Sequence, residues 1–316
     1  MVADKRAELI EILEKRNIRT VFQPIFDVKN AKIIGYEALS RGPSGSILER
    51  PDELFDAARE HNMLWEIELL CRSLAIERAS QRGLDKFLFL NVDPRIIRDE
   101  KFKEGFTNKF VKSFNIEPQK IIFEITEKTA IEDYKAFKEV LDHYVRQGYK
   151  IAIDDTGAGY SGMRLITETK PQFIKLDMGL IRDIDKDSFK QAICRNLLTL
   201  SKITNMKLIA EGVETINEVN TLINIGVEYL QGYFLARPSE AFQEISEDVI
   251  VHIRDILNDK LKEKLYTSKT YPVGKIVRID EPITINYKGS QLKNYFENSK
   301  AQGVAVVKDK IPVGLL

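Results

Sequence analysis

Short apolar runs alternate with helical patterns along most of the chain, and this rhythm limits the folds that the sequence can adopt. Most of the runs are separated by segments with the 3.6-residue apolar period of an amphipathic helix. Eight strand-like runs occur before residue 240, at 20–26, 33–39, 87–92, 121–127, 151–155, 173–177, 208–211 and 229–234. Eight such repeats are typical of the α/β class and predict a closed (β/α)8, TIM-type barrel over residues 1–245.

The start of this barrel departs from the regular pattern. The first two strands are joined by the polar turn 27–30, which is too short for a crossover helix. One of the two strands must therefore run antiparallel to its neighbour. The sequence predicts a modified barrel with one antiparallel strand. A helical pattern from Pro51 to about Arg82 predicts one long helix after the second strand.

The pattern changes after Pro238. Residues 246–270 are charged, with apolar positions at helical spacing, and predict a helical linker. Residues 271–316 predict a small α+β segment, with strands at 283–285, 304–307 and 313–316 and a helix near 292–296. A segment of this size is small for an independent hydrophobic core. The chain is therefore expected to stop inside a domain.

Composition excludes several classes of protein. Lys plus Arg equals Asp plus Glu at 48 each, so no overall field attracts duplex nucleic acid or an anionic membrane. No apolar run approaches the ~18 residues of a membrane span, and the charged N-terminus predicts no signal peptide. The two cysteines, Cys71 and Cys194, lie in apolar helical surroundings and are expected to be buried free thiols. We therefore predict a cytoplasmic protein.

The segment 149–161 carries the strongest chemical signal. An apolar strand (Ile151 to Ile153) ends in Asp154 and Asp155, followed by a glycine-rich turn. Two carboxylates at the end of a buried strand repel each other and are costly to desolvate, so a metal ion or a lysine is expected beside them. The alternative is that the two acids only cap the next helix or form an Asx turn.

Other strands also end in polar side chains, and in a barrel the carboxyl ends of the strands meet on the face where active sites lie. The candidate metal ligands are all oxygens, and the three histidines lie outside the strand ends. Such donors suit Mg²⁺ or Mn²⁺, and their number suits a two-metal site that activates water against a phosphate ester. The full set of strand-end groups is Glu37, Asn91, Glu124, Asp154, Asp155, Lys175, Glu211 and Gln231.

Each of these residues also has a purely structural interpretation. Glu37 and Glu127 could be exposed charges at strand ends, and Asn91 could be a turn residue. Lys175 could be the counter-ion of a buried acid, or it could orient attacking hydroxide and stabilise developing negative charge. Gln231 could satisfy backbone groups. Their placement on successive strand ends is what favours a shared site.

The segment Tyr36–Arg41, with Glu37, Ala38 and Leu39 in sequence, resembles the signature of the EAL domain, the family of cyclic di-GMP phosphodiesterases. The likeness covers roughly residues 5–245. Further motifs agree in order, namely Phe22-Gln-Pro-Ile25, Asn91-Val92, Phe123-Glu-Ile-Thr-Glu127, Asp154-Asp155, Ile174-Lys-Leu-Asp177, Glu211-Gly-Val-Glu214 and Gln231-Gly-Tyr233. The resemblance implies metal-dependent hydrolysis of cyclic di-GMP to linear pGpG by a modified barrel, and a homodimer.

The resemblance also implies residue roles. One metal ion would be held by Glu37, Asn91, Glu124 and Asp154. The second would be held by Asp154 and Asp155, with Glu211 nearby through water. Lys175 would position the nucleophilic water, and Glu127 would brace the loop after Asp155 that couples dimerisation to activity. The expected substrate contacts are Gln23, Leu39, Arg41 and Gln231.

Two features depart from the family or extend beyond it. The loop after Asp155 has Thr156 and Ala158 where family members usually have Phe and Thr, which changes loop packing without removing a ligand. The tail resembles the first part of a CBS domain at 284–287 and 303–314. Such modules often bind adenine nucleotides as pairs, and half of one is not expected to bind alone. A small packing extension of the barrel is the alternative for this tail.

Two competing functions remain at this point. The glycine pattern 157–162, with Asp177 twenty residues after Gly157, fits a dinucleotide-binding fingerprint. However, Asp154 and Asp155 directly precede it and would repel a pyrophosphate. The second alternative is a cyclic di-GMP receptor that signals through dimerisation or its C-terminal module without cleaving the ligand. Both the receptor and the enzyme need the pocket, and only hydrolysis needs every metal ligand.

Overall fold

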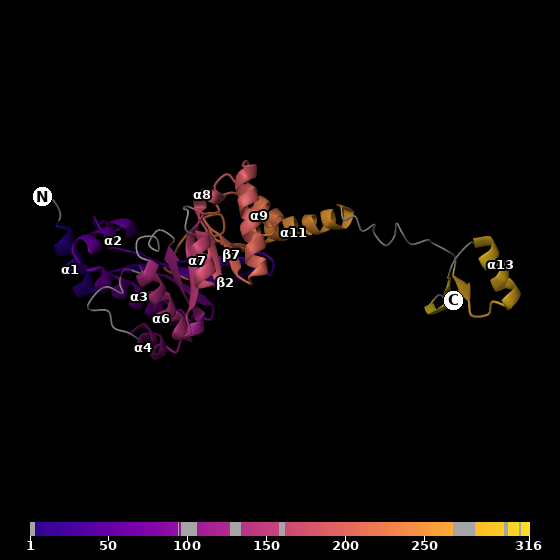
Figure 1. The fold of residues 1–316 in the computed structure, drawn as a ribbon, viewed down its shortest axis with the longest axis horizontal. Coiled ribbons are helices and arrows are strands. Elements are labelled where there is room, and N and C mark those ends of the chain that lie inside the picture. The colour runs from indigo at the N-terminus through magenta and orange to yellow at the C-terminus, as the bar shows by residue number, and fades with distance from the viewer. Residues whose placement is uncertain are drawn as a thin grey trace. The chain divides into compact units, whose positions relative to one another are not determined.

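The computed structural model describes residues 4–93, 95, 106–126, 134–157, 162–267, 282–299, 303–309 and 311–316. Glu127 and Ala158 lie outside the described residues, so the expectations for them stay predictions. The chain divides into two compact units, 1–258 and 259–316, and each is described by itself. Figure 1 shows the fold, with colour following the residue number and labels on many of the helices and strands.

The first unit contains a closed eight-stranded barrel whose strands follow one another in chain order. β1 is antiparallel to both of its neighbours, β2 and β8, and the other neighbouring pairs are parallel. This confirms the predicted barrel with one reversed strand, and it excludes the open doubly wound sheet of a dinucleotide-binding fold. The strands are β1 (Arg19–Asp27), β2 (Lys32–Arg41), β3 (Phe87–Asn91), β4 (Ile121–Thr126), β5 (Lys150–Thr156), β6 (Phe173–Leu176), β7 (Lys207–Ala210) and β8 (Tyr229–Leu230).

The reversal of β1 follows from the turn between β1 and β2. The carboxylate of Asp27 accepts hydrogen bonds from the backbone N–H of Asn30 (3.0 Å) and from its side-chain amide (2.8 Å). This Asx-type turn brings the chain back after a few residues, so β2 pairs with β1 directly. Opposite Gln23 in this hairpin lies Glu37, which brings an amide beside a carboxylate.

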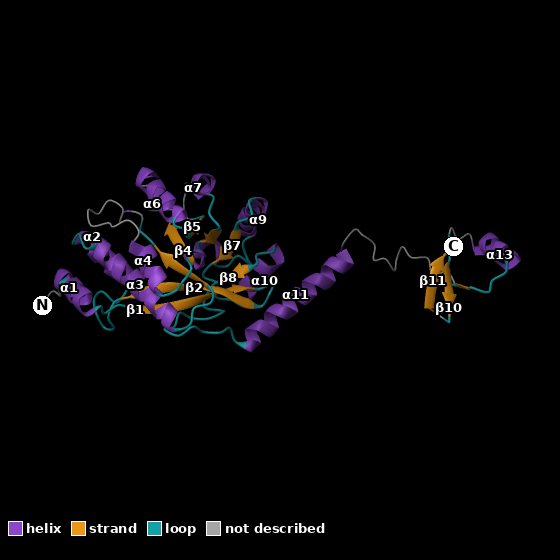
Figure 2. Cartoon of the chain, turned by 90° about the horizontal axis from the view of Figure 1, so that it is seen from below, coloured by secondary structure: helices purple, strands orange, loops and turns teal. Residues whose placement is uncertain are grey.

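Helices surround the strands of this unit (Figure 2). They are α1 (Lys5–Lys15), α2 (Pro51–Glu60), α3 (Leu64–Gln81), α4 (Phe106–Ser113), α6 (Tyr134–Arg146), α7 (Gly162–Thr169), α8 (Met178–Ile181), α9 (Ser188–Ile203) and α10 (Ile216–Ile225), with a short 3₁₀ turn η2 (Pro118–Lys120). A further helix, α11 (Glu247–Thr267), begins in this unit and continues past its last residue, 258. The single long helix predicted for 51–82 is wrong. Asn62 has a φ of 55°, a left-handed conformation that ends α2 and lets α3 start in a new direction.

The barrel interior is built in layers because alternate residues of each strand point inward. One buried cluster consists of Ile25, Phe89, Ile122, Ala152, Phe173 and Ile209. Two residues closer to the end of the barrel where the parallel strands finish, the inward positions become polar. They are Gln23, Asn91, Glu124, Asp154, Lys175 and Glu211. Gly35 gives room to this packing, because a Cβ there would lie 2.9 Å from the ring of Phe89. The apolar layer thus forms the floor of a polar site.

The second unit is a three-stranded sheet with one described helix. β10 (Ala305–Lys308) lies in the middle, parallel to β9 (Ile283–Thr284) and antiparallel to β11 (Ile311–Leu315), and α13 (Gly289–Ser299) connects β9 to β10. This order matches the strand–helix–strand–strand pattern expected for the tail. Several large apolar side chains of this unit are exposed, among them Ile311, Val313 and Leu315.

Two further expectations concern the cysteines and the membrane. Cys71 and Cys194 are buried and free, as predicted. In the part of the chain that the structure describes, no helix has the length and apolar character needed to cross a bilayer.

Candidate active site

The polar layer of the barrel is organised around Lys175 on β6. Its side chain is 1% exposed, and its Nζ lies 2.6 Å from Oε1 of Glu124, 3.3 Å from Oε2 of Glu37 and 3.5 Å from Oδ1 of Asp154. It also contacts Glu211. Four carboxylates from β2, β4, β5 and the end of β7 thus meet one ammonium group. The strand-end residues predicted from the sequence do converge.

Hydrogen bonds fix the orientation of Glu37. Asn91 donates through Nδ2 to Oε1 of Glu37 (2.9 Å), and Gln231 donates through Nε2 to Oε2 (2.6 Å). The Gln231 amide also donates to Gln23 Oε1 (3.3 Å), and Gln23 in turn donates to the carbonyl of Ala236 (3.2 Å). Both glutamines are buried. Glu37 is therefore held from two directions, by Asn91 at the end of β3 and by Gln231 directly after β8.

Burial and mutual repulsion perturb the ionisation of the cluster. Burial, followed by repulsion from Glu37, raises the pKa of Glu124 well above its usual value. Burial also raises the pKa of Asp154. For Glu37 burial acts in the same direction, but the Lys175 ammonium and the hydrogen bonds from Gln231 and Asn91 outweigh it and lower the pKa. The carboxylates of this layer are therefore in excess of the positive charge available to them.

Lys175 stays protonated in this environment. Burial alone would lower its pKa, but Asp154, Glu124 and Glu37 raise it above the usual value for a lysine. Among these acids the Lys175 ammonium serves as a hydrogen-bond donor and as a positive charge.

Asp155 extends the cluster toward solvent. Its φ of 55° is unusual for a residue with a side chain, and its backbone N–H donates to Oδ1 of Asp154 (3.0 Å). Burial and repulsion from Asp154 and Asp177 raise the pKa of Asp155 to about 6. Strained backbone beside paired acids is typical of a functional site.

The arrangement of the acids fits divalent cations. Among the described residues, ligand atoms within 4.8 Å of one another occur in two groups that share Glu211, one with Glu37 and Glu124 and one with Asp154 and Asp155. Oε1 of Glu124 and Oε1 of Glu211 are buried, and among the described residues each faces the Lys175 ammonium. Hard cations such as Mg²⁺ and Mn²⁺ prefer carboxylate oxygens of this kind. The donor set therefore fits a divalent-cation centre.

We expect Mn²⁺ to raise the thermal stability of the protein, and this stabilisation to depend on pH. A cation and a proton compete for Asp155, whose pKa is about 6. Above that pH the carboxylate is charged and binds the cation, and below it the proton displaces the cation. Scanning fluorimetry with and without Mn²⁺ should therefore show a shift in Tm at about pH 8 that shrinks at about pH 5. A shift of equal size at both pH values would contradict a site that includes Asp155.

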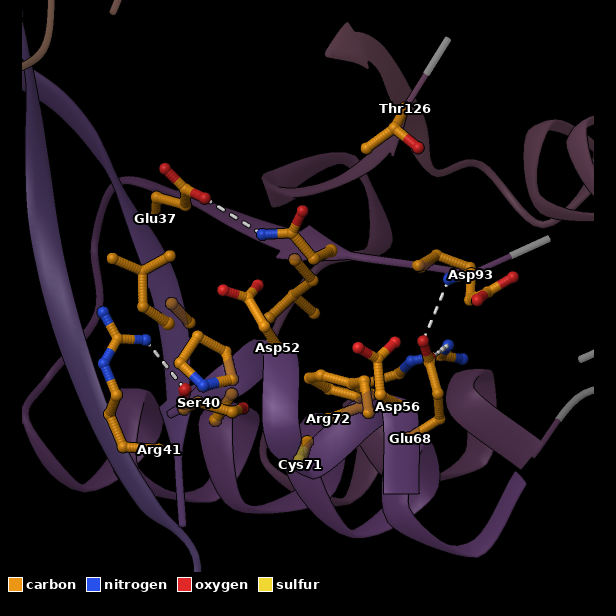
Figure 3. A pocket seen from close by; sticks show the side chains of 18 of the residues that line it. Glu37, Ser40, Arg41, Asp52, Asp56, Glu68, Cys71, Arg72, Asp93 and Thr126 are labelled. Atoms are coloured by element: carbon orange, nitrogen blue, oxygen red, sulfur yellow. Dashed lines mark hydrogen bonds and ion pairs between the residues drawn. The ribbon is translucent and has the colours of Figure 1, made fainter. Parts of the chain in front are cut away.

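A cavity of about 580 Å³ opens beside Glu37 and Asn91. Figure 3 shows Arg41 on one side of it, with Asp52 and Asp56 on α2 directed into it. Leu39 and Arg41, two of the four predicted substrate contacts, line this cavity. Gln23 and Gln231 lie instead in the buried layer next to Glu37, so their predicted contact with substrate remains untested.

The sequence did not identify the wall of this cavity opposite β2. It is formed by residues of α2, α3 and the segment after β3, including Arg59, Glu68, Arg72, Asp93 and Arg95. Glu68 and Arg72 are four residues apart on α3, and this spacing of an acid and a base was a usable signal.

Comparison with known proteins places this site in a family. The model of the EAL domain matches residues 6–238. The chain belongs to the EAL-domain family. Residues 271–316 lie outside this match, so their likeness to part of a CBS domain stays a prediction. Because the matched range contains β1 to β8, the site described above is that of the EAL domain.

Relatives and solved structures agree with this assignment. The bifunctional diguanylate cyclase/cyclic di-GMP phosphodiesterase MucR of Pseudomonas aeruginosa is 28% identical over 243 residues, which is 75% of this chain and 35% of MucR. A standalone EAL protein of Vibrio cholerae, solved with c-di-GMP bound, is 34% identical with a TM-score of 0.63, covering 73% of this chain and 96% of that one. Klebsiella pneumoniae BlrP1, solved as a calcium/cy-diGMP complex, is 31% identical with a TM-score of 0.67. The match covers 72% of this chain and 57% of that one.

The chain spans only part of its longer relatives. It covers 35% of MucR and 45% of the probable cyclic di-GMP phosphodiesterase PdeN of Escherichia coli, which is 29% identical over 240 residues, or 73% of this chain. The similarity therefore concerns the EAL domain and not the remaining parts of those proteins.

Proposed function

We propose that this chain hydrolyses cyclic di-GMP to linear pGpG with the help of Mg²⁺ or Mn²⁺ and acts as a homodimer. The observation that carries the proposal is the complete ring of acids around Lys175, with Asp155 beside it. Relatives named as cyclic di-GMP phosphodiesterases, and structures solved with this dinucleotide, support the choice of substrate.

The reaction adds one water molecule across a phosphodiester. The water oxygen attacks phosphorus, the bond from phosphorus to the 3′ ribose oxygen breaks, and that oxygen takes up a proton. The phosphate remains on the 5′ oxygen, which gives linear pGpG. When bound, the two divalent cations activate the water and neutralise charge on the phosphate.

The residues of this chain have distinct tasks in the proposal. Glu37, Asn91, Glu124 and Asp154 hold one cation, and Asp154, Asp155 and Glu211 surround the other. Lys175 positions the attacking water and stabilises negative charge, because its ammonium stays protonated. The substrate lies along the cavity beside Glu37, in contact with Leu39 and Arg41.

The proposal predicts a specific role for Gln231. Changing Gln231 to Leu removes the 2.6 Å hydrogen bond to Oε2 of Glu37. We expect kcat to fall about tenfold, the effect of one lost hydrogen bond to a charged group, with KM little changed. Steady-state kinetics on the purified variant measures both constants. A rise in KM at unchanged kcat would instead indicate that Gln231 contacts the substrate.

The test of the proposal is product formation. Purified protein is incubated with cyclic di-GMP and Mg²⁺, Mn²⁺ or EDTA, and pGpG is quantified by chromatography while binding is followed in parallel. Metal-dependent pGpG supports the enzyme. Tight binding without product would make the chain a receptor and direct attention to Thr156, which stands where family members usually have Phe.

A further inference from the structure

A buried ion pair on α3 lies beside the cavity and has no part in the chemistry proposed above. Oε2 of Glu68 accepts a hydrogen bond from Nη2 of Arg72 (3.0 Å). The two side chains are 6% and 5% exposed, and both line the cavity (Figure 3). A buried ion pair contributes little net stability in general, so its presence beside a site calls for another explanation.

Arg72 is held in place from several elements at once. Its Nη1 donates to Oγ1 of Thr107 on α4 (3.1 Å) and to the hydroxyl of Tyr144 on α6 (3.0 Å). Its guanidinium also lies over the ring of Phe123 on β4, 5.3 Å from the centroid. With contacts to three elements besides its own helix, Arg72 has one well-defined position. Glu68, bound to Arg72, is fixed with it.

The second oxygen of Glu68 holds the chain after β3. Oε1 accepts the backbone N–H of Asp93 at 2.9 Å. The Asp93 carboxylate is in turn contacted by Arg95 (Nη2 to Oδ2, 2.6 Å) and by Arg59 (Nη1 to Oδ2, 3.6 Å). Asp93, Arg59 and Arg95 all line the cavity, and we call them the Asp93 wall. Glu68 therefore fixes the backbone at Asp93, whose carboxylate pairs with Arg95 and contacts Arg59, which is also paired with Asp56 on α2.

The metal ligand next to this wall is held independently. Asn91 is paired with Glu124 in the β3–β4 ladder, and its side chain donates to Glu37. Asp93 lies beyond the end of β3 and outside the ladder. Loss of Glu68 should therefore displace the Asp93 wall and leave the acids around Lys175 in place. Each oxygen of Glu68 accepts one hydrogen bond, which ties the carboxylate to Arg72 and to the backbone of Asp93.

We propose that Glu68, held by Arg72, is a positioning residue that sets the affinity of the cavity for its dinucleotide through the Asp93 wall. The inference rests on the proposed function of the same site. In this proposal the Asp93 wall serves substrate binding, and the acids around Lys175 serve catalysis. The two roles are separable by experiment.

The test compares kinetics of Glu68→Ala, Glu68→Gln and wild type with cyclic di-GMP and Mg²⁺. Glu68→Ala removes both hydrogen bonds, and we expect KM to rise about tenfold or more while kcat changes less than about twofold. An amide at position 68 can still accept the Asp93 N–H, so Glu68→Gln should lie between the two. Mn²⁺ binding, measured by calorimetry with the metal alone, should be unchanged in both variants.

A matched control is available on the same helix. Glu77 pairs with Arg16 at the surface (3.1 Å), and Glu77 is not among the residues that line the cavity. Glu77→Ala should leave KM and kcat at wild-type values. A fall in kcat for Glu68→Ala at constant KM, or a loss of Mn²⁺ binding, would overturn the inference by placing Glu68 in the metal centre. So would wild-type kinetics in both Glu68 variants.

Two outcomes need separate treatment. If Glu68→Ala does not fold, Glu68→Gln carries the test, and an unchanged KM in that variant overturns the inference. If wild type binds cyclic di-GMP without cleaving it, the proposed function fails, and the same comparison is made on Kd. A weaker Kd in the variants then supports the Asp93 wall, and an equal Kd overturns it.

Discussion

Replacing Glu37 with Gln is expected to lower the turnover of cyclic di-GMP by at least about a thousandfold without unfolding the protein. The two side chains have nearly the same shape, but Gln carries no charge. Glu37 contributes to one of the two acidic groups and lies 3.3 Å from Lys175, so its loss removes a metal ligand from the centre of the site. The measurement is kcat with saturating Mg²⁺, together with circular dichroism to verify the fold.

Glu49 provides the control for this substitution. It pairs with Arg19 at 2.6 Å, is partly exposed, and is not one of the acids that pair with Lys175. Glu49→Gln should therefore keep wild-type turnover. If Glu37→Gln retained turnover within about tenfold of wild type, the two-metal assignment would be wrong.

Replacing Lys175 with Met is expected to destabilise the metal-free protein by about 3–5 kcal/mol, the usual cost of removing one partner of a buried ion pair. Glu37, Glu124, Asp154 and Glu211 would then face one another without an ammonium. Mn²⁺ should restore more stability to this variant than it adds to wild type, because the cations replace the lost positive charge. Urea unfolding in EDTA and in Mn²⁺ measures both effects.

The pH dependence of this variant follows from the raised pKa of its acids. Burial already raises the pKa of Glu124 in wild type, and loss of Lys175 raises it further. An acid whose pKa is higher in the folded state destabilises the fold once it ionises, and has no such effect below the pKa of the unfolded chain. The loss of stability should therefore be larger at about pH 8 than at about pH 5. A variant as stable as wild type in EDTA at both pH values would show that Lys175 does not balance these charges.

Much of the barrel could be predicted because its signals are local. Apolar runs with helical segments between them identify strands, and the polar turn at 27–30 identifies the reversed strand. The break at Asn62 was missed because the apolar period continues on both sides of it, while the backbone turns through one left-handed residue. The last strand is shorter than expected: β8 ends at Leu230, and Gln231 is already in the loop.

The site could be predicted where its residues follow the alternation of inward and outward side chains along each strand. Glu124, Asp154 and Lys175 lie two residues beyond buried inward-facing residues of their own strands, so their convergence follows from the fold. The residues of the cavity wall do not follow this alternation. Glu68 reaches Asp93 across 25 residues of sequence, and that contact depends on how α3 packs against the end of β3. Tertiary packing of this kind leaves no periodic trace in a single sequence.

The most direct test of the account is hydrolysis of cyclic di-GMP by the purified protein in Mg²⁺ or Mn²⁺, with EDTA as the control. The ring of acids around Lys175 predicts pGpG as the product in the presence of either metal ion and none in EDTA. Binding of cyclic di-GMP without any pGpG in either metal ion would contradict the enzymatic account.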